Sequence, residues 1–104
     1  MESLVVDRLV HEPARLAVMT VLAYVGDADF VFLQRATELT KGNLSSHLAK
    51  LEDAGLVRIE KRFVQRKPRT SVALTAQGKR RVERHWQQLD RLKRLATSRR
   101  PSPS

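Results

Sequence analysis

The organisation of this chain follows from residues 42–57, which read GNLSSHLAKLEDAGLV. At about 100° of rotation per residue, Leu44, Leu48 and Leu51 fall within about 60° of one another and form one apolar face of a helix. Residues 40–43 interrupt any preceding helix, and Gly55 closes this one as a C-cap glycine. We therefore expect a helix that restarts at 43 and ends at 54, with its leucine face turned into a core.

The outward side of this helix carries small polar residues and one lysine. Ser46 lies almost opposite the leucines, and Lys50 lies within about 60° of that direction. Short hydroxyl side chains permit close approach to a double helix, and lysine reaches a base edge or a phosphate. His47 lies on the flank, where a phosphate or structural role fits better. The predicted nucleic-acid-binding residues of the stretch 41–54 are Lys41, Gly42, Asn43, Ser45, Ser46, His47 and Lys50.

Helical patterns also precede this stretch. Pro13 suits the first turn of a helix, and residues 13–25 form a largely buried one. A turn at 26–29 leads, with a short strand at 29–31 as an option, into a helix over about 31–38. Residues 4–10 are compatible with a short amphipathic helix. Two helices joined by a short glycine-containing turn form a helix-turn-helix, whose second helix enters the major groove.

A β-hairpin is predicted after the glycine. Residues 56–62 and 71–74 alternate apolar and polar side chains, as half-buried strands do. The segment between them, residues 65–69, is a polar turn whose Pro68 limits the freedom of the backbone. Arginine is favoured in narrow minor grooves, where the negative potential is enhanced. The hairpin residues expected to contact nucleic acid are Lys61, Arg62, Arg66, Lys67 and Arg69.

The chain ends in a predicted long helix and a tail. Thr75 is a good N-cap for a helix running to about Leu95. Its apolar positions recur at helical spacing, and the tail 97–104 is rich in Ser, Pro and Arg, as disordered segments are. The predicted domain is residues 1–96, with the hairpin at about 57–75, the last helix at about 75–96 and the tail after it.

Charge is distributed unequally along the chain. The 104 residues carry a formal net charge of +9, with 20 Lys+Arg against 11 Asp+Glu. Residues 1–53 hold five basic and eight acidic side chains, whereas residues 54–104 hold fifteen and three. A basic half on an otherwise balanced domain is typical of a protein that binds a polyanion. Nucleic acid is the favoured polyanion, with anionic membranes and acidic proteins left as alternatives.

Several classes of function are not supported by the sequence. There is no cysteine, and His11, His47 and His85 lack ligand spacing, so we expect neither a metal site nor a cofactor. Ser45, Ser46 and His47 are consecutive and diverge by about 100° per residue, so they do not form a nucleophile–base pair and no enzyme is expected. The apolar stretch 16–25 is too short to span a bilayer, and the N-terminus lacks a signal-peptide pattern, so a cytoplasmic location is expected.

These motifs together resemble the winged helix-turn-helix transcriptional regulators of the MarR/ArsR type, in their compact single-domain form. The pattern L-S-x-H-L-x-x-L-E-x-A-G-L-V maps onto residues 44–57, and H-x-P-x-R-L onto residues 11–16. The segment K-P-R-T at 67–70 and the pattern L-T-x-x-G-K at 74–79 match the end of the wing and the start of the last helix. The resemblance covers about residues 9–95. It implies a mainly α fold with a small β-hairpin (α+β), a winged helix-turn-helix.

The resemblance also implies a prokaryotic homodimer that binds a pseudo-palindromic double-stranded DNA site as a repressor or an activator. Such regulators commonly dimerise through their terminal helices. The metal-ligand sets of metal-sensing members are absent, and the chain is short for an enclosed ligand pocket, so a small-molecule effector stays open. The residues expected in the dimer seam are Leu4, Leu9, Val82, Trp86, Leu89 and Leu92.

Two other functions remain open at this level. A winged helix can serve as a protein-interaction module within a larger complex, and the basic surface could bind nucleic acid, RNA included, without sequence preference. The chain has only five aromatic residues, one Trp, one Tyr and three Phe, for a single-strand stacking platform. The salt dependence of duplex binding distinguishes these alternatives from specific DNA binding.

Overall fold

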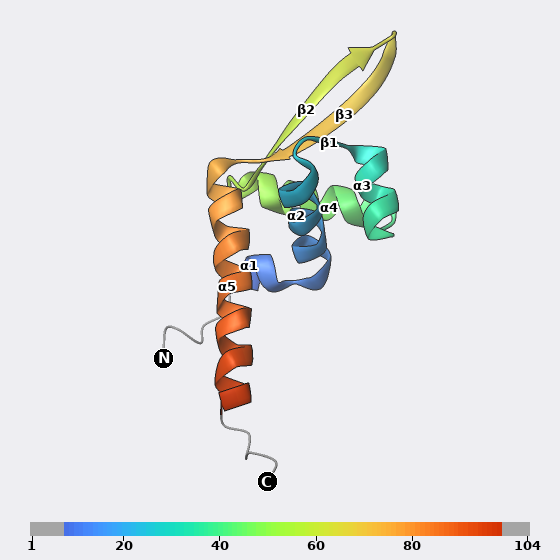
Figure 1. Cartoon of the computed structure of the whole chain (residues 1–104). Helices are drawn as coiled ribbons and strands as arrows, with labels where there is room; N and C mark the ends of the chain where they lie inside the picture. Colours follow the sequence, from blue (N-terminus) through green and yellow to red (C-terminus); the bar gives the residue numbers. More distant parts are fainter. Residues whose placement is uncertain (1–7, 99–104) are drawn as a thin grey trace.

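The computed structural model describes residues 8–98, which form helices around one end of a small sheet (Figure 1). The elements, in chain order, are α1 (Arg8–His11), α2 (Pro13–Val25), β1 (Ala28–Asp29), α3 (Phe30–Thr37), α4 (Lys41–Asp53), β2 (Val57–Val64), β3 (Lys67–Leu74) and α5 (Ala76–Ser98). The predicted mainly α fold with a β-hairpin is confirmed, and β1 adds a third antiparallel strand in the order β1-β3-β2. Among residues 8–98, no helix combines the length and apolar character needed to cross a bilayer.

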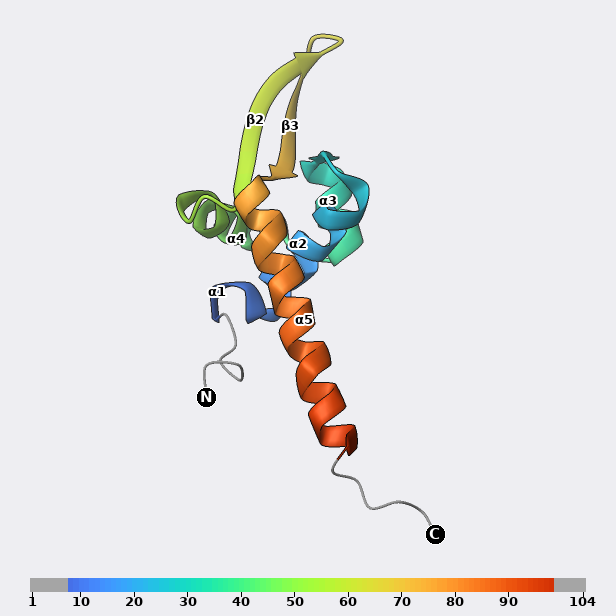
Figure 2. The same cartoon turned by 60° about the vertical axis from the view of Figure 1, so that its left-hand side comes forward.

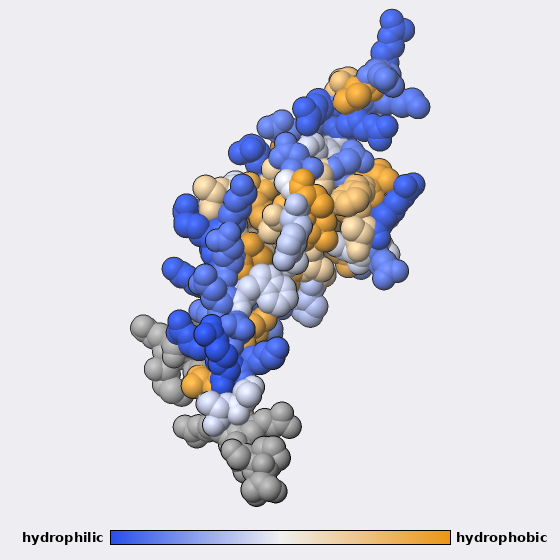
Figure 3. All heavy atoms as spheres, viewed as in Figure 1, coloured by the Kyte–Doolittle hydropathy of each residue, from blue (hydrophilic) through white to orange (hydrophobic). Residues whose placement is uncertain are grey.

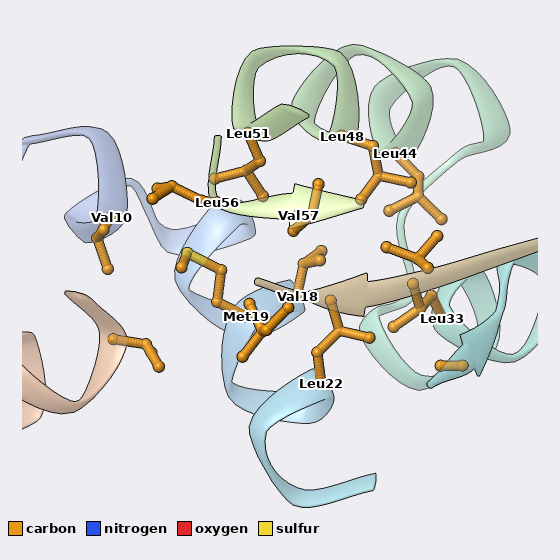
Figure 4. Packing of buried hydrophobic residues seen from close by; sticks show 14 residues of the cluster. Val10, Val18, Met19, Leu22, Leu33, Leu44, Leu48, Leu51, Leu56 and Val57 are labelled. Atoms are coloured by element: carbon orange, nitrogen blue, oxygen red, sulfur yellow. The ribbon is translucent and has the colours of Figure 1, made fainter. Parts of the chain in front are cut away.

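The core gathers side chains from every layer of the fold (Figure 4). Leu44, Leu48 and Leu51 of α4 are at most 2% exposed, as their helical spacing predicts. Replacing one such buried leucine by alanine costs about 2–5 kcal/mol, so these residues set the orientation of α4. The residues that pack with them are Val10, Val18, Met19, Leu22, Ala28, Leu33, Leu56, Val57, Val72, Leu74 and Val82.

Side-chain caps mark the starts of α2, α4 and α5. The carboxylate of Glu12 accepts hydrogen bonds from the backbone N–H groups of Ala14 and Arg15 at 3.1 Å each. The hydroxyl of Thr40 accepts one from the Asn43 N–H at 3.1 Å, and so begins α4. Thr75 accepts one from the Gly78 N–H at 3.0 Å, which confirms it as the N-cap of α5. Such caps each contribute about 1 kcal/mol.

The hairpin is longer and its turn is tighter than the sequence pattern predicts. Residues 57–64 and 67–74 pair throughout, from Val57 opposite Leu74 to Val64 opposite Lys67. The turn is only Gln65 and Arg66, with φ of 51° and 65°, the double positive φ of a type I′ turn. The prediction of a turn over 65–69 is therefore wrong for residues 67–69, which belong to β3.

The helix boundaries also differ in detail from the prediction. Helix α2 matches the predicted range 13–25, whereas α4 begins at Lys41 because the Thr40 cap replaces the expected break through Asn43. Helix α5 continues to Ser98, so the prediction of a disordered tail is wrong for Thr97 and Ser98. Of the predicted helix at 4–10, residues 4–7 lie outside the described residues, as do residues 99–104 of the tail.

The molecule is elongated, with principal extents of 66 × 26 × 21 Å. The hairpin and α5 leave the helical core in opposite directions, and both views show the far half of α5 standing clear of the other elements (Figures 1 and 2). The core thus carries two projections, a β-hairpin at one end and a long helix at the other.

Candidate nucleic-acid interface

Helix α4 presents a polar face to solvent opposite its three core leucines. All but one of the predicted binding residues of α4 are exposed: Lys41, Gly42, Asn43, Ser45, Ser46 and Lys50. No acidic residue occurs in its first turn. The N-terminal turn of a helix presents backbone N–H groups and a positive dipole end, so this end of α4 suits a phosphate.

Gly42 lies exposed in the first turn of α4. A Cβ built at this position meets nothing within 4 Å, so the packing of the chain itself does not require glycine there. Glycine inside a helix costs about 0.5–1 kcal/mol relative to alanine. A bare backbone at an exposed first turn leaves room for an external group to approach closely.

His47 lies on the flank of α4 and is half-buried, as its helical position predicts. Its Nδ1 lies 3.4 Å from the Glu12 carboxylate and 3.3 Å from the Arg15 guanidinium. Arg15 in turn donates from Nε to the backbone carbonyl of Leu9 at 2.7 Å. These interactions join α4 to the start of α2. The partner of His47 is thus the Glu12–Arg15 pair, which the sequence pattern did not identify.

The groups around the Glu12 carboxyl shift its pKa. Burial raises its pKa, but the backbone N–H groups of Ala14 and Arg15, together with the charges of His47 and Arg15, outweigh that effect. The net pKa of Glu12 lies below its ordinary value of 4.5, so the carboxylate stays charged at neutral pH. The negative charge of Glu12 therefore offsets cationic groups at this flank of α4.

The basic residues of the hairpin divide between its two faces. Successive side chains of a strand alternate between faces, so Lys61 shares a face with Ile59, which packs against the core. Arg62 and Arg69 lie directly opposite each other on the other face. Like charges placed opposite one another destabilise a sheet. All five predicted wing residues are exposed: Lys61, Arg62, Arg66, Lys67 and Arg69.

Helix α4 and the hairpin meet at an open hollow of about 390 Å³. Lys41 and Ser45 of α4 line it together with Lys61 of β2, so the structure brings these three predicted residues into one concave surface. Thr70 and Phe30 also line it and were not predicted. Thr70 lies opposite Lys61 in the hairpin, and this register is the signal that identifies it. Lys50 and Ser46 do not line this hollow.

A second hollow, of about 450 Å³, lies on the other face of the hairpin. Arg62 and Arg69 line it with Asp27 and Asp29, two acidic residues at the edge strand β1. Asp29 also caps α3 by accepting from the Val31 N–H at 3.2 Å. Acidic and basic groups thus share this hollow.

The residues predicted for a dimer seam lie in different surroundings, and two of them belong to the core. Val82 is 1% exposed and belongs to the core of its own chain, and Leu9 is half-buried against the same core. Trp86 is 46% exposed and donates from Nε1 to Thr20 at 3.3 Å, while Leu89 and Leu92 are half-buried. Leu95, 48% exposed, extends the apolar surface and was not predicted. Leu4 lies outside the described residues.

A helix-turn-helix followed by a basic hairpin and a long C-terminal helix defines a winged-helix regulator. The chain belongs to the family of winged helix DNA-binding domains, whose sequence profile matches residues 14–93. This is a family of DNA-binding regulators of transcription and not of enzymes.

The chain is also similar to individual proteins. The chain is 33% identical to a transcriptional regulator homologue from Pyrococcus horikoshii OT3 of known structure, with a TM-score of 0.82 over 89% of this chain and 95% of that one. It is 26% identical to a putative transcriptional regulator of the MarR family from Enterococcus faecalis V583, with a TM-score of 0.60 over 86% and 74%. An uncharacterized protein of Methanocaldococcus jannaschii is 28% identical over 72 residues, covering 69% of this chain and 78% of its own.

Proposed function

We propose that this protein is a homodimeric transcriptional regulator of a prokaryotic cytoplasm that binds a specific double-stranded DNA site. Helix α4 would enter the major groove, and the β2–β3 hairpin would contact the flanking minor groove or its phosphates. The observation that carries the proposal is the hollow where Lys41 and Ser45 of α4 meet Lys61 of the hairpin. One concave surface, with two lysines and the carboxylate of Glu52 in its lining, thereby joins the two elements that a winged helix uses on DNA.

Base contacts are assigned to the outward face of α4. Ser46 and Lys50 are exposed and point away from the core leucines, and neither lines the hollow shared with the hairpin. A lysine hydrogen-bonds the guanine edge in the major groove, and a serine contacts either base type at short range. His47, held by Glu12 and Arg15, is assigned to a phosphate at the flank.

Dimerisation is assigned to the far half of α5. Trp86, Leu89, Leu92 and Leu95 leave apolar surface on a helix that projects beyond the core. A second copy packed on this surface would bury it and would place two α4 helices on one DNA duplex. Successive major grooves on one side of B-DNA are about 34–36 Å apart, which sets the spacing of the two helices.

Selection of bound sites from a pool of random duplexes tests both parts of the proposal. We expect enrichment of an inverted repeat whose half-sites are centred about 10 base pairs apart. Lys50→Ala is expected to relax the preference at one position of each half-site by about 1–3 kcal/mol. Recovery of no common sequence would contradict specific binding, and recovery of single half-sites would contradict the dimer. An unchanged preference in Lys50→Ala would remove that residue from base contact.

A further inference from the structure

An aromatic side chain stands exposed near the tip of the hairpin. Phe63 is 77% exposed, and only Tyr24, at 87%, is more exposed among the large apolar residues of 8–98. At about 3.3 Å per residue, Phe63 lies about 13 Å along β2 beyond Ile59, the last residue of that strand that packs against the core. The ring therefore makes no contribution to the core of its own chain.

The hairpin holds this ring on a stiff support. Phe63 lies directly opposite Pro68, one step from the Val64–Lys67 pair that closes the two-residue turn. At this position the Pro68 nitrogen points away from β2, so the missing N–H costs no hydrogen bond between the strands. The fixed φ of proline restricts the backbone opposite Phe63. The ring is thus presented in a restricted orientation before any partner binds.

Basic residues flank Phe63 in the sequence and on the paired strand. Residues 61–69 hold five basic side chains and no acidic one. In the space-filling view, the apolar atoms near the hairpin tip are enclosed by hydrophilic ones (Figure 3). An apolar protein partner would have to desolvate these charges, whereas DNA offers phosphates at the rim of each groove and apolar base surfaces within it.

We propose that Phe63 enters the minor groove beside the site read by α4, packs against the bases there and bends the duplex. This inference rests on the function proposed above and adds a residue to it. Proteins that bind the minor groove insert apolar side chains such as phenylalanine at base steps and kink the duplex toward the major groove. Arg62, next to Phe63 on β2, together with Arg66 of the turn and Lys67 of β3, would hold nearby phosphates.

The test measures DNA bending and affinity together. A duplex recovered by the selection above is labelled at its two ends with a donor and an acceptor dye, and energy transfer is recorded as protein is added. Wild-type protein is expected to shorten the end-to-end distance at saturation. Phe63→Ala is expected to bind roughly tenfold more weakly and to leave the duplex straighter, because alanine has no ring to stack on the bases. Phe63→Leu, which keeps an apolar wedge, should retain most of the bend.

Tyr24→Ala is the matched control, because it removes an aromatic ring of similar exposure from α2, outside the hairpin. It should bind and bend DNA as the wild type does. Equal bending by Phe63→Ala, or an unbent duplex with the wild type, would overturn this inference while leaving DNA binding intact. Failure of the wild type to select any duplex would instead overturn the proposed function. Circular dichroism of each variant confirms that the exposed substitution leaves the fold unchanged.

Discussion

Two glycines show how single residues serve the fold and the site differently. Gly78 lies in the first turn of α5, where an added Cβ would come within 2.0 Å of the Leu56 carbonyl oxygen. Gly42 lies in the first turn of α4, where an added Cβ would meet nothing within 4 Å. The first glycine is required by the packing of the chain. The second is free for an external ligand, which we take to be DNA.

Substitution by alanine should separate these two roles. Gly78→Ala is expected to lower the free energy of unfolding by about 1–3 kcal/mol, because backbone must move to relieve the clash. Gly42→Ala is expected to raise it by up to about 1 kcal/mol, because alanine is the better helix former. The same Gly42→Ala variant should bind the selected duplex about tenfold more weakly, because its methyl group obstructs the close approach of DNA to the backbone. Urea denaturation and duplex titration measure the two effects. A Gly42→Ala variant that binds DNA as the wild type does would place this turn outside the interface.

The Glu12 carboxylate predicts a pH dependence of stability. Its native pKa is below the ordinary value of 4.5, so the charged form favours the folded state. The stabilisation is fully present above the ordinary pKa and is lost as pH falls through the native one. The advantage of wild type over Glu12→Gln in urea denaturation should therefore shrink between neutral pH and about pH 3. Glu83→Gln, at an exposed position of α5, is the control. A constant difference for Glu12→Gln would refute the assigned role of this carboxylate.

At the scale of elements, the periodicity of apolar residues was sufficient to predict the positions of the helices from the sequence. The leucine spacing of α4 and the Pro13 start of α2 identify helices whose observed ranges agree with the prediction within two residues. The outer hairpin was not predictable in the same way. Residues 63 and 64 are apolar although exposed, and Pro68 lies within a strand, so the alternation that identifies strands fails there. Two consecutive non-glycine residues of positive φ form a turn that no sequence rule favours.

Interactions between distant segments were the least predictable part of the site. The contact between the Glu12 carboxylate and the His47 ring joins residues 35 positions apart and depends on how α2 packs against α4. Periodicity placed His47 on the flank of its helix but could not supply the carboxylate beside it. In the same way, the hollow shared by Lys41, Ser45 and Lys61 depends on the tertiary position of the hairpin.

The hairpin as an element is expected to supply salt-dependent affinity. Replacing Arg66 and Lys67 together by glutamine removes two cations that would bind phosphates. The slope of log affinity against log salt should fall in magnitude by about 0.9 for each phosphate that is no longer neutralised. The control is the pair Arg91→Gln and Lys93→Gln, which removes the same charge from the exposed far half of α5. Equal slopes in the two double variants would exclude the hairpin from the interface.

At the scale of the whole molecule, we assign DNA binding to one projection and dimerisation to the other. The basic hairpin projects from one side of the helical core that contains α4, and α5 extends from the other (Figure 2); we propose that the first end binds DNA and the second a second copy. The extent of 66 Å along the long axis reflects these projections more than the core. A lone helix that leaves apolar side chains in water gains stability when a second copy covers them.

The Leu89→Glu substitution tests whether the far half of α5 forms the dimer interface. A charge in the seam is costly to bury, so the variant should sediment as a monomer and lose cooperative binding to a two-half-site duplex. Its binding to a single half-site should persist, because α4 and the hairpin are unchanged. Gln87→Glu adds the same charge at an exposed position of α5 and should remain dimeric. A dimeric Leu89→Glu protein would move the interface elsewhere.

The most direct test of the central claim is a titration of the wild-type protein against its selected duplex and a scrambled duplex of equal length, over a series of salt concentrations. We predict that log affinity falls linearly with log salt for both duplexes, and that the selected one binds about a thousandfold or more tightly at physiological salt. Equal affinity for the two duplexes, or binding that salt does not weaken, would contradict the assignment of this chain as a sequence-specific DNA-binding regulator.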